Sequence, residues 1–199
     1  GGYLAPSGNW VYLANAITRS VTGTRAYPPD AAFERQMPGS FVTQVEVRNE
    51  TTLSGARRLR QASLCPALLN FASAMSPGGG FLKGARAQEE YLARSSALYA
   101  CLVDQPMYDF HRQWDDPLYT SYLLYSPAVP VFRGDDGALL DEPFKVGMIT
   151  AAAPNAVHLP PHRHPEIEPA FRERIAKLLW TALRHGHDVL FLGACVCGA

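Results

Sequence analysis

The sequence lacks a surplus of charge of either sign. Its 199 residues include 18 Lys plus Arg and 18 Asp plus Glu, so the formal net charge is zero. Proteins that bind nucleic-acid backbones usually carry excess positive charge, because neutralising phosphates supplies most of their affinity. We therefore expect no direct DNA binding. A small anionic ligand held by backbone amides is compatible with this composition.

Long apolar runs are also missing. No stretch approaches the roughly 20 apolar residues that a membrane helix needs, and the opening GGYLAPSGNW lacks the basic and apolar regions of a signal peptide. We therefore expect a monomeric, cytoplasmic protein that does not bind membranes. The length suits one domain, residues 1–199, in which residues 1–40, rich in Gly, Pro and aromatics, form an N-terminal extension.

Cysteine is scarce, and its spacing does not suggest a metal centre. The last two of the four cysteines are only two positions apart, which is poor geometry for a mutual disulfide, so we expect reduced thiols. A zinc site would need two further well-spaced ligands. His162 and His164 in PPHRHP are candidates, but proline-flanked histidines in a loop are usually solvated. We therefore expect neither a metal nor a cofactor. The cysteines are Cys65, Cys101, Cys195 and Cys197.

Periodic segments of the strand type and of the helix type alternate along the chain. Alternating Val and polar residues predict a strand over 41–47, and a short apolar run predicts a buried strand over Pro66–Ala72. Further strands are expected over 122–132, 144–151 and 188–192. Helices are expected over 12–19, 53–63, 88–102 and 168–185. The last of these has one apolar stripe, made of Phe171, Ile175, Leu178, Leu179 and Leu183.

This alternation predicts an α/β domain with a mixed, mostly parallel sheet. In such folds ligands bind where strand ends lead into loops and helix N-termini. Two strands run directly into Gly-rich loops, at 70–84 and at 192–199. The chain has no initiator Met and ends inside the second loop. We therefore expect it to be truncated at both ends, with a last helix and strand missing downstream.

The most informative pattern in the chain is GGG, seven residues, then QEE, over residues 78–90. Consecutive glycines let the backbone approach a ligand and turn amide N–H groups toward it, and a following helix N-terminus favours anions. The paired carboxylates Glu89 and Glu90 could protonate a glycosidic oxygen. Burial would raise the pKa of such a carboxyl and a helix N-terminus would lower it, so the net direction stays open at this point.

Each part of the pattern has a structural explanation when taken alone, since GGG is often a turn and a Glu pair often stabilises a first helical turn. Together, directly after a buried strand, the parts resemble the signature of the poly(ADP-ribose) glycohydrolases. Segment NFASAMSPGGGFLKGARAQEEYLARSSALY is similar to the bacterial-type branch. The resemblance continues near Ser7–Leu13 and in TTLSGARRL, ITAAAPNA and HGHDVLFLGA. It implies a macrodomain-like three-layer α/β/α fold and metal-free release of ADP-ribose from the polymer.

The resemblance also implies roles for individual residues. Glu90 would be the catalytic acid and then the base that activates water, and Glu89 would orient the ribose at the cleaved bond. Gln88 would complete the catalytic loop, Asn70 and Ser73 would lie near that ribose, and Gly78, Gly79 and Gly80 would approach the ligand. The start of the diphosphate-binding loop would be Gly193, Ala194, Cys195, Val196, Cys197, Gly198 and Ala199.

The second loop departs from the family pattern, because Cys195 replaces a common large aromatic residue and Val196 an expected glycine. Two further readings stay open beside the polymer hydrolase. One is a macrodomain reader that binds ADP-ribose without catalysis and does not need both carboxylates. The other is a hydrolase that acts on mono-ADP-ribosylated proteins. The intact QEE favours a hydrolase, whose partners would be poly(ADP-ribose), ADP-ribose and ADP-ribosylated proteins.

Overall fold

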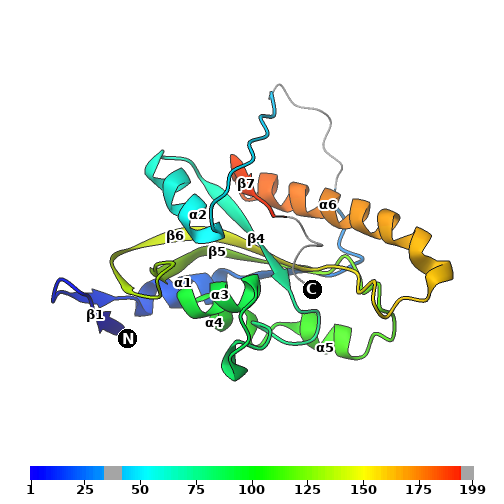
Figure 1. Cartoon of the computed structure of the whole chain (residues 1–199), viewed down its shortest axis with the longest axis horizontal. Helices are drawn as coiled ribbons and strands as arrows, with labels where there is room; N and C mark the ends of the chain where they lie inside the picture. Colours follow the sequence, from blue (N-terminus) through cyan, green and yellow to red (C-terminus); the bar gives the residue numbers. More distant parts are fainter. Residues whose placement is uncertain (34–41, 194–199) are drawn as a thin grey trace.

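The computed structural model describes residues 1–33 and 42–193, and its centre is a five-stranded sheet (Figure 1). The strands lie in the order β3-β5-β6-β4-β7. Their bounds are Arg25–Tyr27 for β3, Leu123–Arg133 for β5, Leu139–Ala152 for β6, Pro66–Ala72 for β4 and Val189–Phe191 for β7. A separate hairpin of β1 (Gly2–Leu4) and β2 (Trp10–Tyr12) precedes them.

The sheet is mixed, as predicted, and its pairing changes direction at β6. β4 pairs in parallel with both β6 and β7, whereas β5 is antiparallel to β3 and β6. A tight turn at Gly134–Ala138, with Gly137 at φ +79°, joins β5 directly to β6. Such a short turn can only connect antiparallel neighbours. Parallel pairing therefore accounts for half of the sheet, a smaller share than the sequence suggested.

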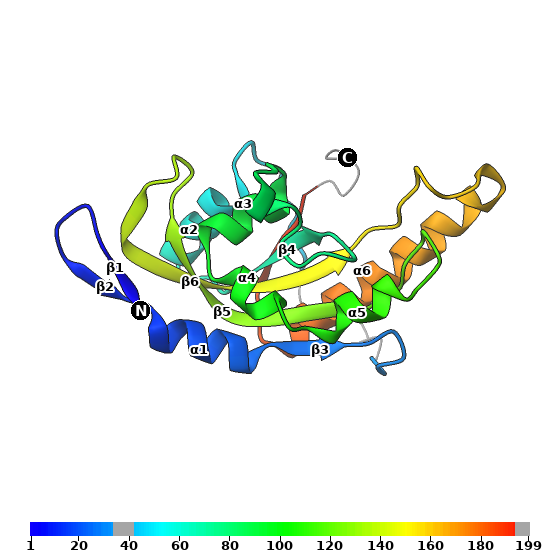
Figure 2. The same cartoon turned by 90° about the horizontal axis from the view of Figure 1, so that it is seen from below.

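Helices cover both faces of the sheet, which confirms the three-layer α/β/α arrangement. Because strand side chains alternate, Leu68, Leu124 and Met148 enter one core cluster, and Leu69, Leu123 and Ile149 enter a second. The first cluster receives side chains from α1 (Ala14–Gly23), α2 (Thr52–Gln61), α3 (Gln88–Ser95), α4 (Leu98–Leu102) and α5 (Pro106–Arg112). The second is covered by α6 (Ile167–Arg184). Figure 1 shows α6 on the opposite side of the sheet from α3 and α4, and Figure 2 shows α4 and α5 in front of the sheet.

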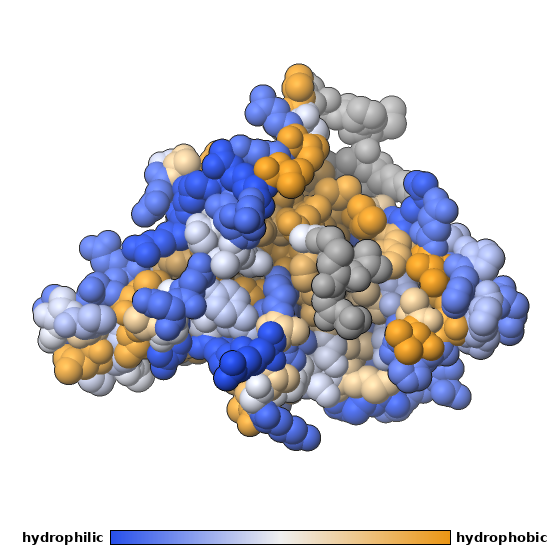
Figure 3. All heavy atoms as spheres, in the orientation of Figure 1, coloured by the Kyte–Doolittle hydropathy of each residue, from blue (hydrophilic) through white to orange (hydrophobic). Residues whose placement is uncertain are grey.

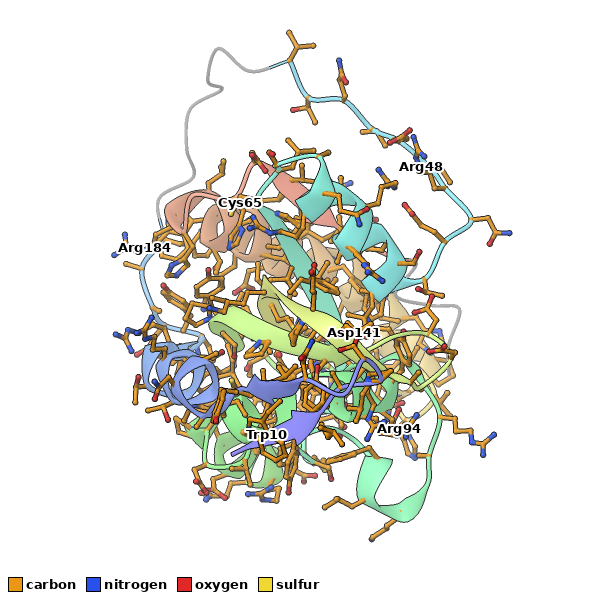
Figure 4. All side chains as sticks on the ribbon, turned by 90° about the vertical axis from the view of Figure 1, so that its left-hand side faces the viewer. Trp10, Arg48, Cys65, Arg94, Asp141 and Arg184 are labelled. Carbon is orange, nitrogen blue, oxygen red and sulfur yellow. The ribbon has the colours of Figure 1, made fainter. Side chains whose placement is uncertain are left out.

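The strand predicted over 41–47 is wrong for the residues that the structure describes. Residues 42–47 have no regular structure, and no strand within 1–33 or 42–193 pairs with them. Val42, Val45 and Val47 are about nine-tenths exposed, and the segment carrying Arg48 stands away from the sheet (Figure 4). Alternation favours a strand only where one face can be buried, and here neither face is.

The apolar stripe predicted on α6 coincides only in part with the buried face of the helix, since Leu178 is buried in the second cluster and three other members are not. Ile175, Leu179 and Leu183 are about half exposed, while Arg174 and Lys177 are buried. Apolar side chains accordingly gather over α6 in the space-filling view (Figure 3). Hydrogen bonds set this rotation of the helix. The Arg174 guanidinium donates to the carbonyls of Leu118 and Thr120, and the Lys177 ammonium donates to that of Pro28.

Several helical features differ from the prediction, among them α5, which lies outside the predicted helices. The helix predicted over 88–102 is interrupted at Ser96, whose hydroxyl donates to the Leu92 carbonyl while its backbone bridges Val131. The short 3₁₀ helices η1 (Phe81–Lys83) and η2 (Pro161–Glu166) lie in segments for which the sequence predicts loops. Within the described part of the chain, none of the helices has the length and apolar character needed to cross a membrane.

Candidate functional site

The GGG loop joins the end of β4 to the start of α3 as a tight, internally bonded turn. Gly78 and Gly79 have φ values of +69° and +60°, a region that L-residues with a side chain rarely adopt. The Gly79 N–H donates to the Ser76 carbonyl at 3.0 Å. The Phe81 ring packs edge-on against Tyr99 of α4 with a 4.7 Å centroid separation. The loop is therefore anchored at both ends before any ligand binds.

Glu90 is held by backbone amides at the start of α3. Its Oε1 accepts from the Gly80 N–H and its Oε2 from the Ala87 N–H, both at 2.9 Å. A Cβ atom at Gly79 would overlap Oε1, so only glycine fits there. Burial by itself would raise the pKa of Glu90, but the N–H donors outweigh it and the pKa lies below its usual value. In the free protein Glu90 is a fixed carboxylate.

Glu89 has the opposite electrostatic character. Its side chain is only 3% exposed, with Oε2 accepting from the Ser73 N–H at 2.6 Å and Oε1 accepting from the Asn70 amide at 3.3 Å. Burial raises its pKa to about 7, against the lowering effect of these donors, and the charge of Glu90 adds to the rise. Near neutral pH the pair therefore combines a carboxylate at Glu90 with a partly protonated carboxyl at Glu89.

Gln88 bonds to the edge of β4 rather than to the cavity. Its Nε2 donates to the Leu69 carbonyl at 2.8 Å, and its Oε1 accepts from the Phe71 N–H at 3.0 Å. β7 pairs with β4 only as far as Leu68. The Gln88 amide thus bonds the two backbone groups of β4 that a longer β7 would have paired with. It also fixes the start of α3 against the sheet.

A cavity of about 450 Å³ opens beside Glu90. It is lined by backbone from the glycine turn and by side chains from both ends of the loop, namely Ser73, Ser76, Gly79, Gly80, Leu82, Lys83 and Glu90. Ser73 accepts from the N–H groups of Met75 and Ser76 through its hydroxyl, which shapes the wall opposite the turn. The arrangement places one carboxylate next to a concave space with both polar and apolar lining, which is the geometry of a binding or catalytic site.

The structure brings most of the predicted site residues together. Asn70 and Ser73 contact Glu89, Gly79 and Gly80 contact Glu90, and Gly78 lies close enough to Glu89 to lower its pKa through its backbone. Gly193 lies at the end of β4, where a Cβ would sit 3.0 Å from the Phe71 ring. The remaining predicted residues of the second loop, 194–199, lie outside the described residues.

Other residues at this site were not singled out from the sequence. Thr150 is paired with Asn70 in the parallel register of β4 and β6, and its hydroxyl oxygen accepts from the Asn70 amide at 3.3 Å. The ITAAAPNA segment pointed to this strand without identifying the residue. Leu82, Lys83 and Ser76 line the cavity, and nothing in their spacing marked them, since only the folded turn brings them to it.

The described residues give no indication of a metal site. Within 1–33 and 42–193, no three His, Cys, Asp or Glu side chains are grouped so that they could hold an ion. Cys65 and Cys101 are free thiols. Cys195 and Cys197 lie outside the described ranges. At the pair itself, the carboxylate oxygens accept hydrogen bonds from amides, so the local chemistry is that of proton transfer and anion stabilisation.

Comparison with known proteins identifies relatives of this arrangement. A family model described as the catalytic domain of microbial-type PARG matches residues 1–134. The structure of poly(ADP-ribose) glycohydrolase (PARG) from Thermomonospora curvata superposes with a TM-score of 0.93 at 48% identity, covering 100% of this chain and 75% of that one. The same enzyme bound to the inhibitor ADP-HPD gives a TM-score of 0.90 at 48% identity, covering 100% and 74%.

A second bacterial enzyme agrees with the first. PARG from Deinococcus radiodurans in complex with ADP-ribose gives a TM-score of 0.84 at 44% identity, covering 94% of this chain and 79% of that one. No curated protein sequence matches the chain. The family model covers well over half of the chain. Both structural relatives belong to the same type of enzyme, and the GGG-x7-QEE loop points to the same family. The chain belongs to the microbial-type poly(ADP-ribose) glycohydrolase family.

Proposed function

We propose that this protein hydrolyses the ribose–ribose O-glycosidic bonds of poly(ADP-ribose) and releases ADP-ribose, with Glu90 as general acid and then general base. The observation that carries the proposal is the Glu90 carboxylate, fixed by two backbone N–H groups at the wall of a cavity. The family supports it, as do relatives solved with ADP-ribose and with ADP-HPD.

The proton needed for bond cleavage must reach Glu90 when substrate binds, because Glu90 is ionised in the free protein. Substrate fills the cavity, excludes water and brings diphosphate charge close to the carboxylate. Both effects favour the neutral carboxyl. Protonated Glu90 then donates its proton to the leaving ribose oxygen as the C–O bond breaks, which leaves an oxocarbenium-like ribose beside a carboxylate.

The second half of the reaction returns Glu90 to its starting state. The carboxylate takes a proton from a water molecule whose oxygen adds to the ribose carbon, so that the products are ADP-ribose and the shortened polymer. Glu89 orients the ribose through hydrogen bonds to its hydroxyls. Since the pKa of Glu89 is about 7, it can act there as donor or acceptor. Asn70 and Ser73 hold Glu89 in position.

The other predicted residues act through the backbone. Gly78, Gly79 and Gly80 allow the ligand to come close to the turn, and residues 193–199 bind the diphosphate. Partners of this activity are poly(ADP-ribose) and the proteins that carry it. An ADP-ribose reader without catalysis and a hydrolase of mono-ADP-ribosylated proteins bind the same unit, so they are separated by turnover on defined substrates rather than by affinity.

Release of ADP-ribose from purified poly(ADP-ribose) tests the proposal directly. Glu90→Gln should lower the rate by about 100- to 10,000-fold, the usual contribution of general acid–base catalysis, while calorimetry still detects ADP-ribose binding. Glu142→Gln, at an exposed position of β6, should leave the rate unchanged.

Each alternative has its own signature in this experiment. Full activity of Glu90→Gln would refute the assignment of the acid. A wild-type protein that binds ADP-ribose but releases none would be a reader. Turnover of mono-ADP-ribosylated protein in preference to the polymer would identify the third activity.

A further inference from the structure

The turn after the glycines presents two adjacent side chains at the rim of the cavity. In η1, the Lys83 N–H donates to the Gly80 carbonyl at 2.9 Å, and the Ala85 N–H donates to the same oxygen at 3.2 Å. The guanidinium of Arg94 holds the Ala85 carbonyl at 2.6 Å. Together with the packing of Phe81 on Tyr99, these contacts fix the backbone, so the side chains of the turn are directed without a ligand.

Leu82 and Lys83 have no structural role that accounts for their placement. Leu82 is 74% exposed although it is a large apolar residue, and Lys83 is exposed beside it. In the part of the chain that the structure describes, the Lys83 ammonium makes neither a hydrogen bond nor an ion pair. Both side chains nevertheless line the same cavity as Glu90, where Lys83 is the one cationic side chain among the lining residues.

The two carboxylates divide the site into two sides. Glu89 faces β4 through Asn70 and Ser73, and Gly193, the start of the second Gly-rich loop, lies against Phe71 on that strand. Glu90 faces the turn through the Gly80 N–H. If the terminal ADP-ribose runs from the cleaved bond toward Gly193, the rest of the polymer must leave the bond on the other side, over the turn.

We propose that Leu82 and Lys83 form the subsite for the leaving nucleotide of the polymer, in which Leu82 packs against the adenine and Lys83 pairs with a phosphate oxygen. A purine face and an anionic phosphate separated by one ribose match an apolar and a cationic side chain on adjacent residues. Packing a base on an exposed leucine removes apolar surface from water, which favours binding. An ammonium group forms a charge-assisted hydrogen bond with a phosphate oxygen, which also favours binding. The inference rests on the proposed hydrolysis and adds a recognition element for the polymer.

The test compares polymer turnover with binding of the product. Lys83→Ala should raise KM for poly(ADP-ribose) by about 2- to 5-fold, as expected for one exposed ion pair, and Lys83→Glu should raise it further through repulsion. The slope of log(kcat/KM) against log salt should decrease by about 0.7, the value for one phosphate contact on a single strand. Leu82→Ser should also raise KM. The affinity for ADP-ribose should stay at the wild-type value in all three variants.

Lys145→Ala is the matched control, because Lys145 is an exposed lysine on β6 that does not line the cavity. If Lys83→Ala and Lys145→Ala behave alike toward the polymer, the subsite does not exist. If Lys83→Ala weakens ADP-ribose binding as strongly as polymer turnover, the lysine serves the terminal unit and the assignment is overturned. A wild-type protein without turnover would instead remove the proposed function itself, before any variant is compared.

Discussion

At the scale of single residues, the site depends on one position without a side chain. Gly79 has a positive φ, and its missing Cβ leaves the space that the Glu90 Oε1 occupies. The sequence identified both residues as important, yet it gave no sign that they touch. Nor could it decide which carboxyl holds the proton, because that depends on how deeply Glu89 is buried and on which N–H groups reach Glu90.

Gly79→Ala should therefore lower the rate about 100-fold, whereas Gly84→Ala should leave it unchanged. Both glycines have a positive φ, so each substitution should cost about 1–2 kcal/mol of unfolding free energy through backbone strain. Only at Gly79 would the new methyl group displace the carboxylate, since nothing lies within 4 Å of a Cβ at Gly84. A shift of about 1 Å can reduce the rate about 100-fold. Urea unfolding and ADP-ribose release measure the two effects, and equal rates in the two variants would contradict this account.

Loss of the proton from Glu89 should make the native state less stable as the pH rises. Its folded pKa of about 7 lies above its ordinary value of 4.5, so between these values the native state binds more protons than the unfolded state, and stability falls with increasing pH. The loss attributable to Glu89 is on the order of 3 kcal/mol.

Urea unfolding of wild type and Glu89→Gln between pH 4.5 and 8 measures this dependence. The variant should gain stability relative to wild type across the range, since it carries no titrating group there. Glu142→Gln should follow the wild-type curve. Parallel curves for wild type and Glu89→Gln would mean that Glu89 does not titrate in this window.

At the scale of elements, local patterns predicted most helices and strands but not which of their faces are buried. The helix predicted from residue 53 begins one residue earlier, after Thr51, whose hydroxyl accepts from the Ser54 N–H at 3.1 Å. β4 appears over the predicted Pro66–Ala72. The rotation of α6 was not readable, because it follows from carbonyls in distant loops that bind Arg174 and Lys177. A periodic pattern contains no information about such partners.

Neighbouring leucines on α6 test this orientation. Leu178 is 5% exposed and packs in the second core cluster, whereas Leu179 is 46% exposed. Leu178→Ala should lower the unfolding free energy by about 2–4 kcal/mol because it leaves a cavity, and Leu179→Ala should change it by less than about 1 kcal/mol. Chemical denaturation of both variants is sufficient. Equal losses would show that Leu178 and Leu179 are equally buried, which would contradict the observed orientation of α6.

At the scale of the whole molecule, the site uses only the parallel half of the sheet. β6, β4 and β7 run in one direction, so their carboxyl ends meet at one edge, where Asn70, Thr150 and Gly193 lie. The antiparallel strands β3 and β5 extend the sheet away from this edge. The alternation of strands and helices was enough to predict ligand binding at strand ends. It did not predict the antiparallel half of the sheet, because that half is formed through the short turn at Gly137 and through β3, a strand too short to recognise in the sequence.

Binding of ADP-ribose at this edge should raise the unfolding free energy of the protein. ADP-ribose at 100 times its Kd should raise the unfolding free energy by about 2.7 kcal/mol through mass action, and a thermal scan should show the transition move upward by several degrees. Glu90→Gln should show a similar shift, since it keeps the cavity. AMP, which lacks the second phosphate and the terminal ribose, should give a smaller shift. An ADP-ribose shift no larger than that of AMP would argue against a site for the whole unit.

The contact between Gln88 and β4 has a consequence for solubility. Among the described residues, no strand pairs with this edge of β4 past Leu68, and an unprotected edge of this kind is a surface on which another polypeptide can add a strand and start aggregation. The Gln88 amide occupies the Phe71 N–H and the Leu69 carbonyl, so the residue next to Glu89 and Glu90 also shields the fold from self-association. Replacing it with alanine would expose the edge, and the damage would then appear as lost soluble yield at high concentration, even where the remaining soluble protein still turns over substrate.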